Sequence, residues 1–337
     1  MEYFSLNKTA CEAADGVLGV LLTNLGTPDA PTPTALRRYL RQFLSDPRVI
    51  EIPKWRWWPI LHGIILRVRP AKSAALYASV WTDQGSPLLT ISKAQQERLQ
   101  TILRQEPNTD ARVALGMRYG NPDIDSALRD LQSQGATKII VLPLYPQYAG
   151  ATTGSTFDAV ADALKRFRWV PELVFINGYY DHPEYIEALA NSIEEHFAQH
   201  GKPEKLLLSY HGMPQRYSEQ GDPYYRYCQA TSRLVAARLH LQPEEYVTCF
   251  QSRFGREVWL KPYTDEALTE LARSGVKSVA VACPGFSADC LETIEEIGVE
   301  NRKVFMDAGG QNYSYVAALN DRPDHLQMIR SLVRPYL

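Results

Sequence analysis

The chain lacks the features that mark several large protein classes. Its five cysteines (Cys11, Cys228, Cys249, Cys283 and Cys290) are odd in number and contain no Cys-x-x-Cys pair. This disfavours a disulfide framework and a conventional zinc or iron–sulfur knuckle. No apolar run reaches the ~18–20 residues that a membrane-spanning helix needs. We therefore expect neither structural disulfides nor a spanning helix.

A surplus of charge of one sign is also missing. The 337 residues include 36 Lys and Arg against 38 Asp and Glu, so no overall field would attract nucleic acid. The stretch Met1 to Asp15 contains acidic residues and no long apolar core, so we expect no secretory signal. The sequence predicts a cytoplasmic protein of one large domain or two ordinary ones, without a nucleic-acid partner.

What the chain does contain is a repeated alternation of short apolar runs with helical patterns. The runs lie at residues 17–22, 111–117, 139–142, 206–209, 246–251 and 279–282. Continuous short apolar runs separated by helical stretches are typical of buried parallel strands in βαβ units. The pattern predicts an α/β fold.

The second three runs follow the same order as the first three. Arg118-Tyr119-Gly120 follows one run and Arg253-Phe254-Gly255 follows its counterpart, and Gly135 and Gly275 precede the third run of each set. Two similar halves would explain these matches, and so would chance likeness between βαβ units. We place the N-terminal half at residues 1–180 and the C-terminal half at 181–337.

The first half carries a long insertion, roughly residues 30–110. Within it, residues 54–69 hold three of the six tryptophans beside several arginines and a lysine. One interpretation is a buried helix with an aromatic anchor. The other is an apolar lip with a basic rim, suited to a flat amphipathic ligand or to a membrane surface. Aromatic faces with a few cations also suit a large conjugated ring that carries carboxylates.

Two candidate reactive groups lie at the ends of predicted strands. His211 ends the run 206–210, and the run 279–283 leads into a segment with Glu292, Glu296 and Glu300. Glutamates at i, i+4 and i+8 share one face of a helix, and parallel sheets bind ligands at the carboxyl ends of their strands. Taken singly, His211 could be structural and the glutamates a solvated face. Together they suit chemistry in which a cation arrives and protons leave.

Two other candidate sites do not match the sequence motifs of the functions that they suggest. The turn Asn24-Leu25-Gly26-Thr27-Pro28 lacks the Gly-x-Gly-x-x-Gly of a dinucleotide site. His196 and His200 are one helical turn apart but lack the glutamate of a zinc motif. Because they precede Gly201 at a predicted helix end, the helix dipole is sufficient to explain them.

Several longer strings resemble the ferrochelatase family, and they occur in order over nearly the whole chain. They are Asn24–Pro28, Gly85–Pro87, Tyr145–Tyr148, Ser209–Pro214, Phe250–Gly255, Trp259–Glu266 and Ser287–Thr293. The chain is similar to the bacterial branch, which lacks a C-terminal iron–sulfur extension.

The resemblance implies a lyase that inserts Fe(II) into protoporphyrin IX to give protohaem, the last step of haem biosynthesis. It implies two similar Rossmann-like, chelatase-type halves, each a parallel β-sheet flanked by helices, with the active-site cleft between them. Protoporphyrin IX and ferrous iron would be the substrates, with no tightly bound cofactor. Cys283 and Cys290 lack two further cysteines at a suitable spacing, so no iron–sulfur cluster is expected. Peripheral membrane contact stays open.

The resemblance also assigns roles to residues. It implies that His211 and Glu292 are catalytic and bind the metal, and that Glu296 and Glu300 continue an acidic path. Residues implied to bind porphyrin are Leu25, Tyr77, Ser86, Arg118, Tyr119, Trp259 and Phe286. Residues expected in the lip are Trp57, Trp58, Arg67 and Arg69. Where many relatives have histidine before Leu-Glu or Ile-Glu, this chain has Cys290, which puts in doubt a metal route through a second histidine.

Three alternatives remain at this point. The same fold could metallate coproporphyrin, or insert cobalt into a related tetrapyrrole. A non-catalytic tetrapyrrole carrier would keep the aromatic lip but need neither His211 nor the glutamates. A nucleotide-dependent α/β enzyme is weakened by the missing phosphate fingerprint.

Overall fold

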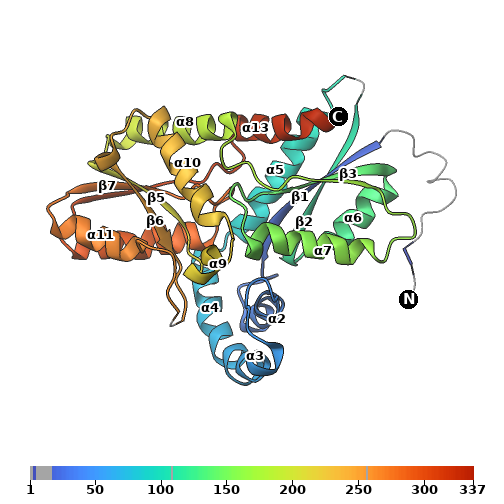
Figure 1. Cartoon of the computed structure of the whole chain (residues 1–337), viewed down its shortest axis with the longest axis horizontal. Helices are drawn as coiled ribbons and strands as arrows, with labels where there is room; N and C mark the ends of the chain where they lie inside the picture. Colours follow the sequence, from blue (N-terminus) through green and yellow to red (C-terminus); the bar gives the residue numbers. More distant parts are fainter. Residues whose placement is uncertain (1–2, 5–16, 108, 256) are drawn as a thin grey trace. The chain divides into compact units, whose positions relative to one another are not determined.

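The computed structural model describes residues 3–4, 17–107, 109–255 and 257–337 (Figure 1). Cys11 lies outside the described residues, as does most of the stretch 1–15 on which the expectation of no secretory signal rests. Among the helices that are described, none combines the length and apolar content needed to cross a membrane.

The chain divides into two compact units. The first comprises Met1–Leu144, Gly150–Gly178 and Leu326–Leu337, and the second comprises Tyr145–Ala149 and Tyr179–His325. The predicted halves, 1–180 and 181–337, differ from these units mainly at the C-terminus. Residues 326–337 belong to the first unit, where Arg330 forms an ion pair with Glu106.

The first unit is built on a four-stranded parallel sheet with the strand order β2-β1-β3-β4. Its strands are β1 (Val17–Thr27), β2 (Asp110–Gly120), β3 (Ala136–Pro143) and β4 (Glu172–Phe175). The predicted apolar runs form these strands because both faces of the sheet are covered. Val20, Leu22 and Ile140 are fully buried on one face, and on the other Leu21, Ile139 and Val141 pack into one buried cluster with Leu128 and Val160. Those two residues come from the helices α6 (Ile124–Ser133) and α7 (Ser155–Leu164). The π-helix η2 (Gly150–Gly154) leads directly into α7.

The predicted insertion is helical and lies between β1 and β2. It contains α2 (Pro33–Leu44), α3 (Lys54–Ile60), the π-helix η1 (Leu61–Ile65), α4 (Leu66–Val80) and α5 (Pro87–Leu103). Thr32 caps α2, because its hydroxyl accepts a hydrogen bond from the Ala35 amide, and Pro33 occupies the first turn. Helices α2, α3 and α4 lie together at one end of this unit (Figure 1), where Leu36, Tyr39 and Trp57 form one buried cluster with Tyr119 of β2.

The second unit repeats the topology of the first. Its parallel sheet has the order β6-β5-β7-β8, with β5 (Lys205–His211), β6 (Tyr246–Gln251), β7 (Ser278–Ala282) and β8 (Asn312–Val316). In each unit the first strand is central, the second lies beside it at one edge, and the fourth lies at the other edge. The shared strand order supports the interpretation of two similar halves over chance likeness.

Helices connect the strands of the second unit. They are α8 (Pro183–His200), α9 (Gln215–Glu219), α10 (Tyr224–Arg238), η3 (Pro243–Glu245), α11 (Thr264–Arg273), η4 (Glu292–Asn301) and α12 (Arg302–Asp307). The chain then enters α13 (Pro323–Val333) and η5 (Arg334–Tyr336). Because all strands of the sheet run parallel, His211, Gln251 and the segment after β7 come to one edge of it.

Candidate active site in the second unit

His211 presents one free ring nitrogen at the exposed end of β5. Its Nδ1 lies 2.7 Å from the carbonyl oxygen of Gly212. A carbonyl only accepts hydrogen bonds, so Nδ1 carries the proton and the neutral ring keeps its lone pair on Nε2. The side chain is exposed. His211 is therefore set up to accept a proton at Nε2.

Gly212 allows the chain to turn closely against the neighbouring strand. Its N–H donates to the Gln251 carbonyl at 2.7 Å. An added Cβ at this position would lie 2.7 Å from the same oxygen and 2.9 Å from a ring carbon of Trp259. The Tyr224 hydroxyl also donates to the His211 carbonyl, at 3.0 Å. Contacts on both sides thus fix the backbone of His211 and Gly212, from which the imidazole extends.

The acidic segment forms a π-helix, whereas the i, i+4, i+8 argument assumed an α-helix. Glu292 is the first residue of η4, and Glu296 and Glu300 lie in its later turns. A π-helix has i→i+5 hydrogen bonds, so residues four apart stay on one side but drift around the axis. Glu292 and Glu296 are half-buried and Glu300 is exposed. Of the three glutamates, Glu300 is therefore the one exposed to solvent.

The Glu296 carboxylate is held by the residue that follows β6. The Ser252 amide donates to Oε1 at 2.7 Å, and the Ser252 hydroxyl donates to Oε2 at 2.5 Å. Burial raises the pKa of Glu296, while the Ser252 hydroxyl, the charge of His211 and the Ser252 amide act in the opposite direction. The protonation of Glu296 is therefore linked to its neighbours at this edge.

A buried polar network lies behind these groups. The Ser209 hydroxyl donates to Gln251 Oε1 at 2.8 Å and lies 2.8 Å from the Thr264 hydroxyl. Gln251 Nε2 in turn donates to the Glu292 carbonyl at 2.9 Å. The network links β5, which carries His211, to the start of η4. Sequence reasoning assigned no role to Gln251 or Ser252, although their place at the end of an apolar run was the available signal.

Cys290, two residues before Glu292, is a buried free thiol. Burial raises the pKa of its thiol well above the ordinary value, and the neighbouring Glu292 carboxylate raises it further. The other three cysteines that the structure describes are also buried free thiols. Cys290 is thus a neutral group beside Glu292, and it offers no imidazole for proton or metal transfer.

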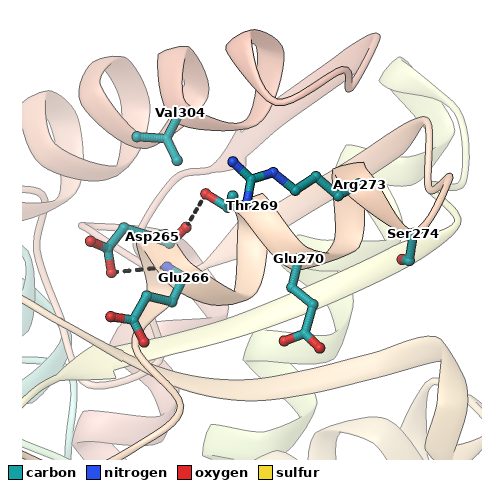
Figure 2. Close-up of a pocket in the computed structure, with 7 residues that line it drawn as sticks. All are labelled: Asp265, Glu266, Thr269, Glu270, Arg273, Ser274 and Val304. Atoms are coloured by element: carbon teal, nitrogen blue, oxygen red, sulfur yellow. Dashed lines mark hydrogen bonds between the residues drawn. The ribbon is translucent and has the colours of Figure 1, made fainter.

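Two hollows adjoin this region of the second unit. A cavity of about 300 Å³ is lined by Gln251, Ser252, Glu296, Glu300 and Asn301, among others. The buried Oδ1 of Asn301 has no hydrogen-bond partner. A larger groove of about 600 Å³ runs along α11 and α12, between Asp265 at one end and Arg273 and Ser274 at the other (Figure 2). The candidate reactive groups lie next to the smaller cavity. The larger volume of the groove along α11 therefore does not mark it as the candidate active site.

The predicted porphyrin-binding residues of the second unit lie near His211 or pack on the core. The Trp259 ring is 6.5 Å from the His211 ring, centroid to centroid, and is half-buried. Phe286 is half-buried and packs against the cluster that contains Cys283 and Ile297.

In the first unit, Arg118 and Tyr119 belong to a largely buried polar cluster. The Tyr119 hydroxyl donates to Asp46 Oδ2 at 2.8 Å, and Arg118 forms a 2.5 Å ion pair with the same carboxylate. Arg118 Nε also donates to the Ser155 carbonyl at 2.9 Å. Tyr119 is 2% exposed, and burial raises its pKa. The Arg118 side chain keeps 21% of its surface exposed, so of the two only Arg118 presents appreciable surface to a ligand.

The remaining predicted residues of the first unit are not fully exposed. Ser86 is buried and accepts a hydrogen bond from the Thr27 hydroxyl at 2.9 Å. Leu25 and Tyr77 are half-buried and pack on the cluster that contains Tyr119 and Leu36.

The segment expected to form a lip has both an exposed apolar face and a buried anchor. Trp58 is 48% exposed, and Trp55, Ile60, Ile64 and Val68 are exposed as well. Trp57, in contrast, is 8% exposed, and its Nε1 donates to the Leu44 carbonyl at 2.6 Å. The exposed face therefore contains Trp58 and not Trp57, because neighbouring helical positions point in different directions.

The two arginines predicted for the lip differ in burial. Arg67 is exposed, and Arg69 is half-buried. Burial lowers the pKa of Arg69 from its ordinary value. Arg56 supplies a further cation, 4.6 Å from the centroid of the Trp55 ring.

Comparison with known proteins identifies similar sequences over the whole site. The family model described as Ferrochelatase matches residues 17–337. Ferrochelatase 2 of Shewanella oneidensis is 57% identical over 325 residues, covering 96% of this chain and 99% of that protein. The ferrochelatase of Pseudoalteromonas atlantica is 53% identical over 337 residues, covering 100% of this chain and 93% of that protein.

Solved structures share the fold at low sequence identity. SirB from Bacillus subtilis with Fe3+ has a TM-score of 0.57 at 13% identity, with 94% of both chains covered. CbiX, described as the terminal enzyme of sirohaem biosynthesis in denitrifying bacteria, has a TM-score of 0.51 at 14% identity, with 95% of this chain and 99% of that chain covered. The two parallel sheets flanked by helices are thus a chelatase-type fold.

Proposed function

Because this chain belongs to the ferrochelatase family, we propose that it inserts ferrous iron into protoporphyrin IX with His211 as the acceptor of pyrrole protons. The enzyme is a lyase of haem biosynthesis. Its reaction consumes Fe(II) and the free-base ring, and yields protohaem and two protons.

The hydrogen bond from His211 Nδ1 to the Gly212 carbonyl is the observation that carries the role of His211. Metallation removes two protons from the pyrrole nitrogens, so a base must lie at the ring. A neutral imidazole with its lone pair on Nε2 is a suitable base near neutral pH. After the first transfer, the imidazolium gives up its proton before it accepts the second. The carboxylates of η4, among which Glu296 interacts electrostatically with His211, are the proposed acceptors of that proton.

Glu292 and His211 are the proposed ligands of the incoming iron. Ferrous iron accepts mixed imidazole and carboxylate ligation, and a site with few protein ligands releases the metal readily to the ring. Within the described residues, no three His, Cys, Asp or Glu side chains are grouped to hold a metal ion. Glu296 and Glu300 continue from Glu292 toward solvent, and we propose that they carry the cation inward or protons outward.

The porphyrin is proposed to contact aromatic and apolar side chains, with Arg118 as a partner for a carboxylate. The exposed portion of Arg118 and its planar guanidinium support that role. Trp259, Phe286, Leu25 and Tyr77 are half-buried and are proposed to pack against the ring. Ser86 and Tyr119 are buried, and we propose that they support the porphyrin-binding side chains from behind. The proposed role of Trp259 is supported by the 6.5 Å separation between its ring centroid and that of His211.

The lip is proposed to gather porphyrin and to touch a membrane surface peripherally from the cytoplasmic side. Support comes from the exposed Trp58, Ile64 and Val68 together with the exposed Arg67. Apolar side chains beside arginines favour the boundary between water and lipid.

We also propose that the enzyme holds no tightly bound cofactor and no iron–sulfur cluster. A cluster needs thiolates, and burial raises the pKa of Cys228, Cys249, Cys283 and Cys290 alike. The Cys283 thiol donates to Gln251 Oε1 at 3.5 Å, so it already has a place in the polar network.

Anaerobic mixing of the purified protein with protoporphyrin IX and Fe(II) tests the proposal. We expect the absorption of the free-base ring to convert to that of haem, faster than in heat-denatured protein. No conversion above that control would contradict the proposal. Parallel reactions with coproporphyrin or with Co(II) identify the preferred ring and metal, and a clear preference for either would overturn the assignment of protoporphyrin or iron.

A further inference from the structure

Ser252 occupies a backbone conformation that serine rarely adopts. Its φ is +64°, in the left-handed region where a side chain normally costs about 1 kcal/mol relative to glycine. The conformation directs the Ser252 amide to Glu296 Oε1 and its hydroxyl to Glu296 Oε2. An unfavourable conformation that places both donors on one carboxylate indicates a specific use for the serine.

From this geometry we infer that Ser252 is a positioning residue that holds the Glu296 carboxylate in place for delivery of the divalent metal ion. The inference rests on the proposed function and extends it to a residue outside the set of predicted ligands. In this inference Ser252 acts through Glu296, the residue to which its amide and hydroxyl donate.

The adjacent residue holds the same helix at a second point. Gln251 Nε2 donates to the Glu292 carbonyl, and Ser209 and Cys283 donate to Gln251 Oε1. Two consecutive residues after the strand core therefore fix two glutamates of η4, one through its backbone and one through its carboxylate. Gln251 fixes where η4 begins, and Ser252 fixes where the second carboxylate points.

The cavity beside Glu296 explains why the carboxylate needs restraint. Ser252, Glu296 and Asn301 line about 300 Å³ of space, enough for the carboxylate to rotate away from Ser252. Asn301 Nδ2 donates to the Glu296 backbone carbonyl and not to its carboxylate. Among the hydrogen bonds of the described residues, those to the Glu296 carboxylate come from Ser252. Loss of the hydroxyl would leave one donor and permit rotation.

Ser252→Gly separates positioning from structural support. Glycine keeps the amide, removes the hydroxyl and relieves the positive φ, so the variant should be at least as stable as the wild type. Loss of a hydrogen bond to a charged group changes a binding constant by a factor of roughly ten or more. We expect the apparent Michaelis constant for Fe(II) to rise about tenfold, with that for protoporphyrin unchanged. Ser252→Ala, which keeps the backbone strain, should show the same change.

Ser232→Ala is the matched control. Ser232 is also a buried serine of the second unit, and its hydroxyl lies 3.0 Å from the Tyr210 hydroxyl, away from η4. We expect its Michaelis constant for Fe(II) to equal that of the wild type. In a Glu296→Gln background, Ser252→Gly should add little further, because the two residues act as one unit.

An unchanged Michaelis constant for Fe(II) in both Ser252 variants, with an active wild type, would overturn the inference and leave the proposed function intact. Equal changes for iron and porphyrin, or a loss of melting temperature that parallels the kinetic loss, would also overturn it. An inactive wild type would instead refute the proposed function.

Discussion

Backbone contacts decide which atoms of single residues are available at the candidate site. The Gly212 carbonyl holds the proton on His211 Nδ1, so the reactive lone pair lies on Nε2. Ser252 orients Glu296 in the same manner. At this scale the reactivity of a side chain depends on donors and acceptors that its own residue type does not reveal.

Gly212 itself gives a direct test of this dependence. In Gly212→Ala the new Cβ would lie 2.7 Å from the Gln251 carbonyl, so the loop that holds His211 must shift. We expect a loss of metallation of roughly 100-fold or more, since misplacement of a reactive group by about 1 Å has effects of that size. Gly285→Ala is the control, because its Cβ would meet its nearest neighbours at 3.6 Å. A fully active Gly212→Ala variant would refute the positioning role of this turn.

The three glutamates of η4 should differ in kind when each is changed to glutamine. Glu292→Gln should abolish most turnover, because it removes the proposed ligand carboxylate with little change of shape. Glu296→Gln should raise the apparent Michaelis constant for Fe(II) and leave substantial activity. Glu300→Gln, at an exposed position, should retain the most activity. Steady-state rates at varied Fe(II) measure this order. A loss at Glu300 as severe as that at Glu292, in folded protein, would contradict a graded path.

Part of the residue-scale picture is accessible from the sequence. His211 and Glu292 follow apolar runs, so their place at the edge of a parallel sheet could be predicted. The tautomer of His211 and the restraint of Glu296 depend on atoms distant in the sequence, and no local pattern encodes them. Trp57 and Trp58 differ by one position, and the burial of one depends on where Leu44 packs.

Among the elements, the insertion between β1 and β2 combines an anchor with an exposed apolar face. Trp57 anchors α3, because its ring packs in a buried cluster and its Nε1 donates a hydrogen bond to the Leu44 carbonyl. Trp58 and Ile64 remain exposed. The two kinds of tryptophan should therefore respond differently to replacement.

Trp58→Ser combined with Ile64→Ser should reduce liposome binding or raise the apparent Michaelis constant for protoporphyrin, with little change in melting temperature. Trp57→Ser should instead lower the free energy of unfolding by about 3–5 kcal/mol, as loss of a buried aromatic ring does. Liposome sedimentation and thermal unfolding separate the two effects. Unchanged liposome binding and unchanged kinetics in the double variant would contradict a role of this segment in binding membranes or porphyrin.

Strands were easier to predict than helix type. The six apolar runs lie in strands because both faces of a parallel sheet are covered. The acidic segment was expected to be α-helical from the spacing of its glutamates, and it is a π-helix over Glu292–Asn301. Spacings of four residues fit both helices nearly equally, so the pattern could not separate them. π-Helical turns occur often at functional sites, and this one begins with the proposed metal ligand.

On the scale of the whole molecule, two units of the same strand order carry different specialisations. The first has the helical insertion, and the second has the histidine and the acidic π-helix. The repeat was visible in the order of the apolar runs. The membership of residues 326–337 in the first unit was not, because sequence order alone does not say which sheet a terminal helix packs on.

His325 links the stability of the protein to pH. Burial lowers its pKa from 6.5 to about 4, so the folded state disfavours the charged ring. The unfolded chain takes up the proton first as the pH falls below about 6.5, so stability is full above that value and declines toward pH 4. A shift of this size corresponds to roughly 3 kcal/mol. Urea unfolding of wild type and His325→Gln across this range should show a shallower decline in the variant. Parallel declines would contradict this account.

The most direct test compares ring binding with metallation in one variant. His211→Ala should bind protoporphyrin IX as tightly as the wild type, measured by fluorescence titration, yet form haem at least about 100-fold more slowly under anaerobic conditions with Fe(II), as expected for loss of a general base. His200→Ala, a change at an exposed histidine of α8, should behave as the wild type in both measurements. A His211→Ala variant that metallates the ring at the wild-type rate would contradict the account.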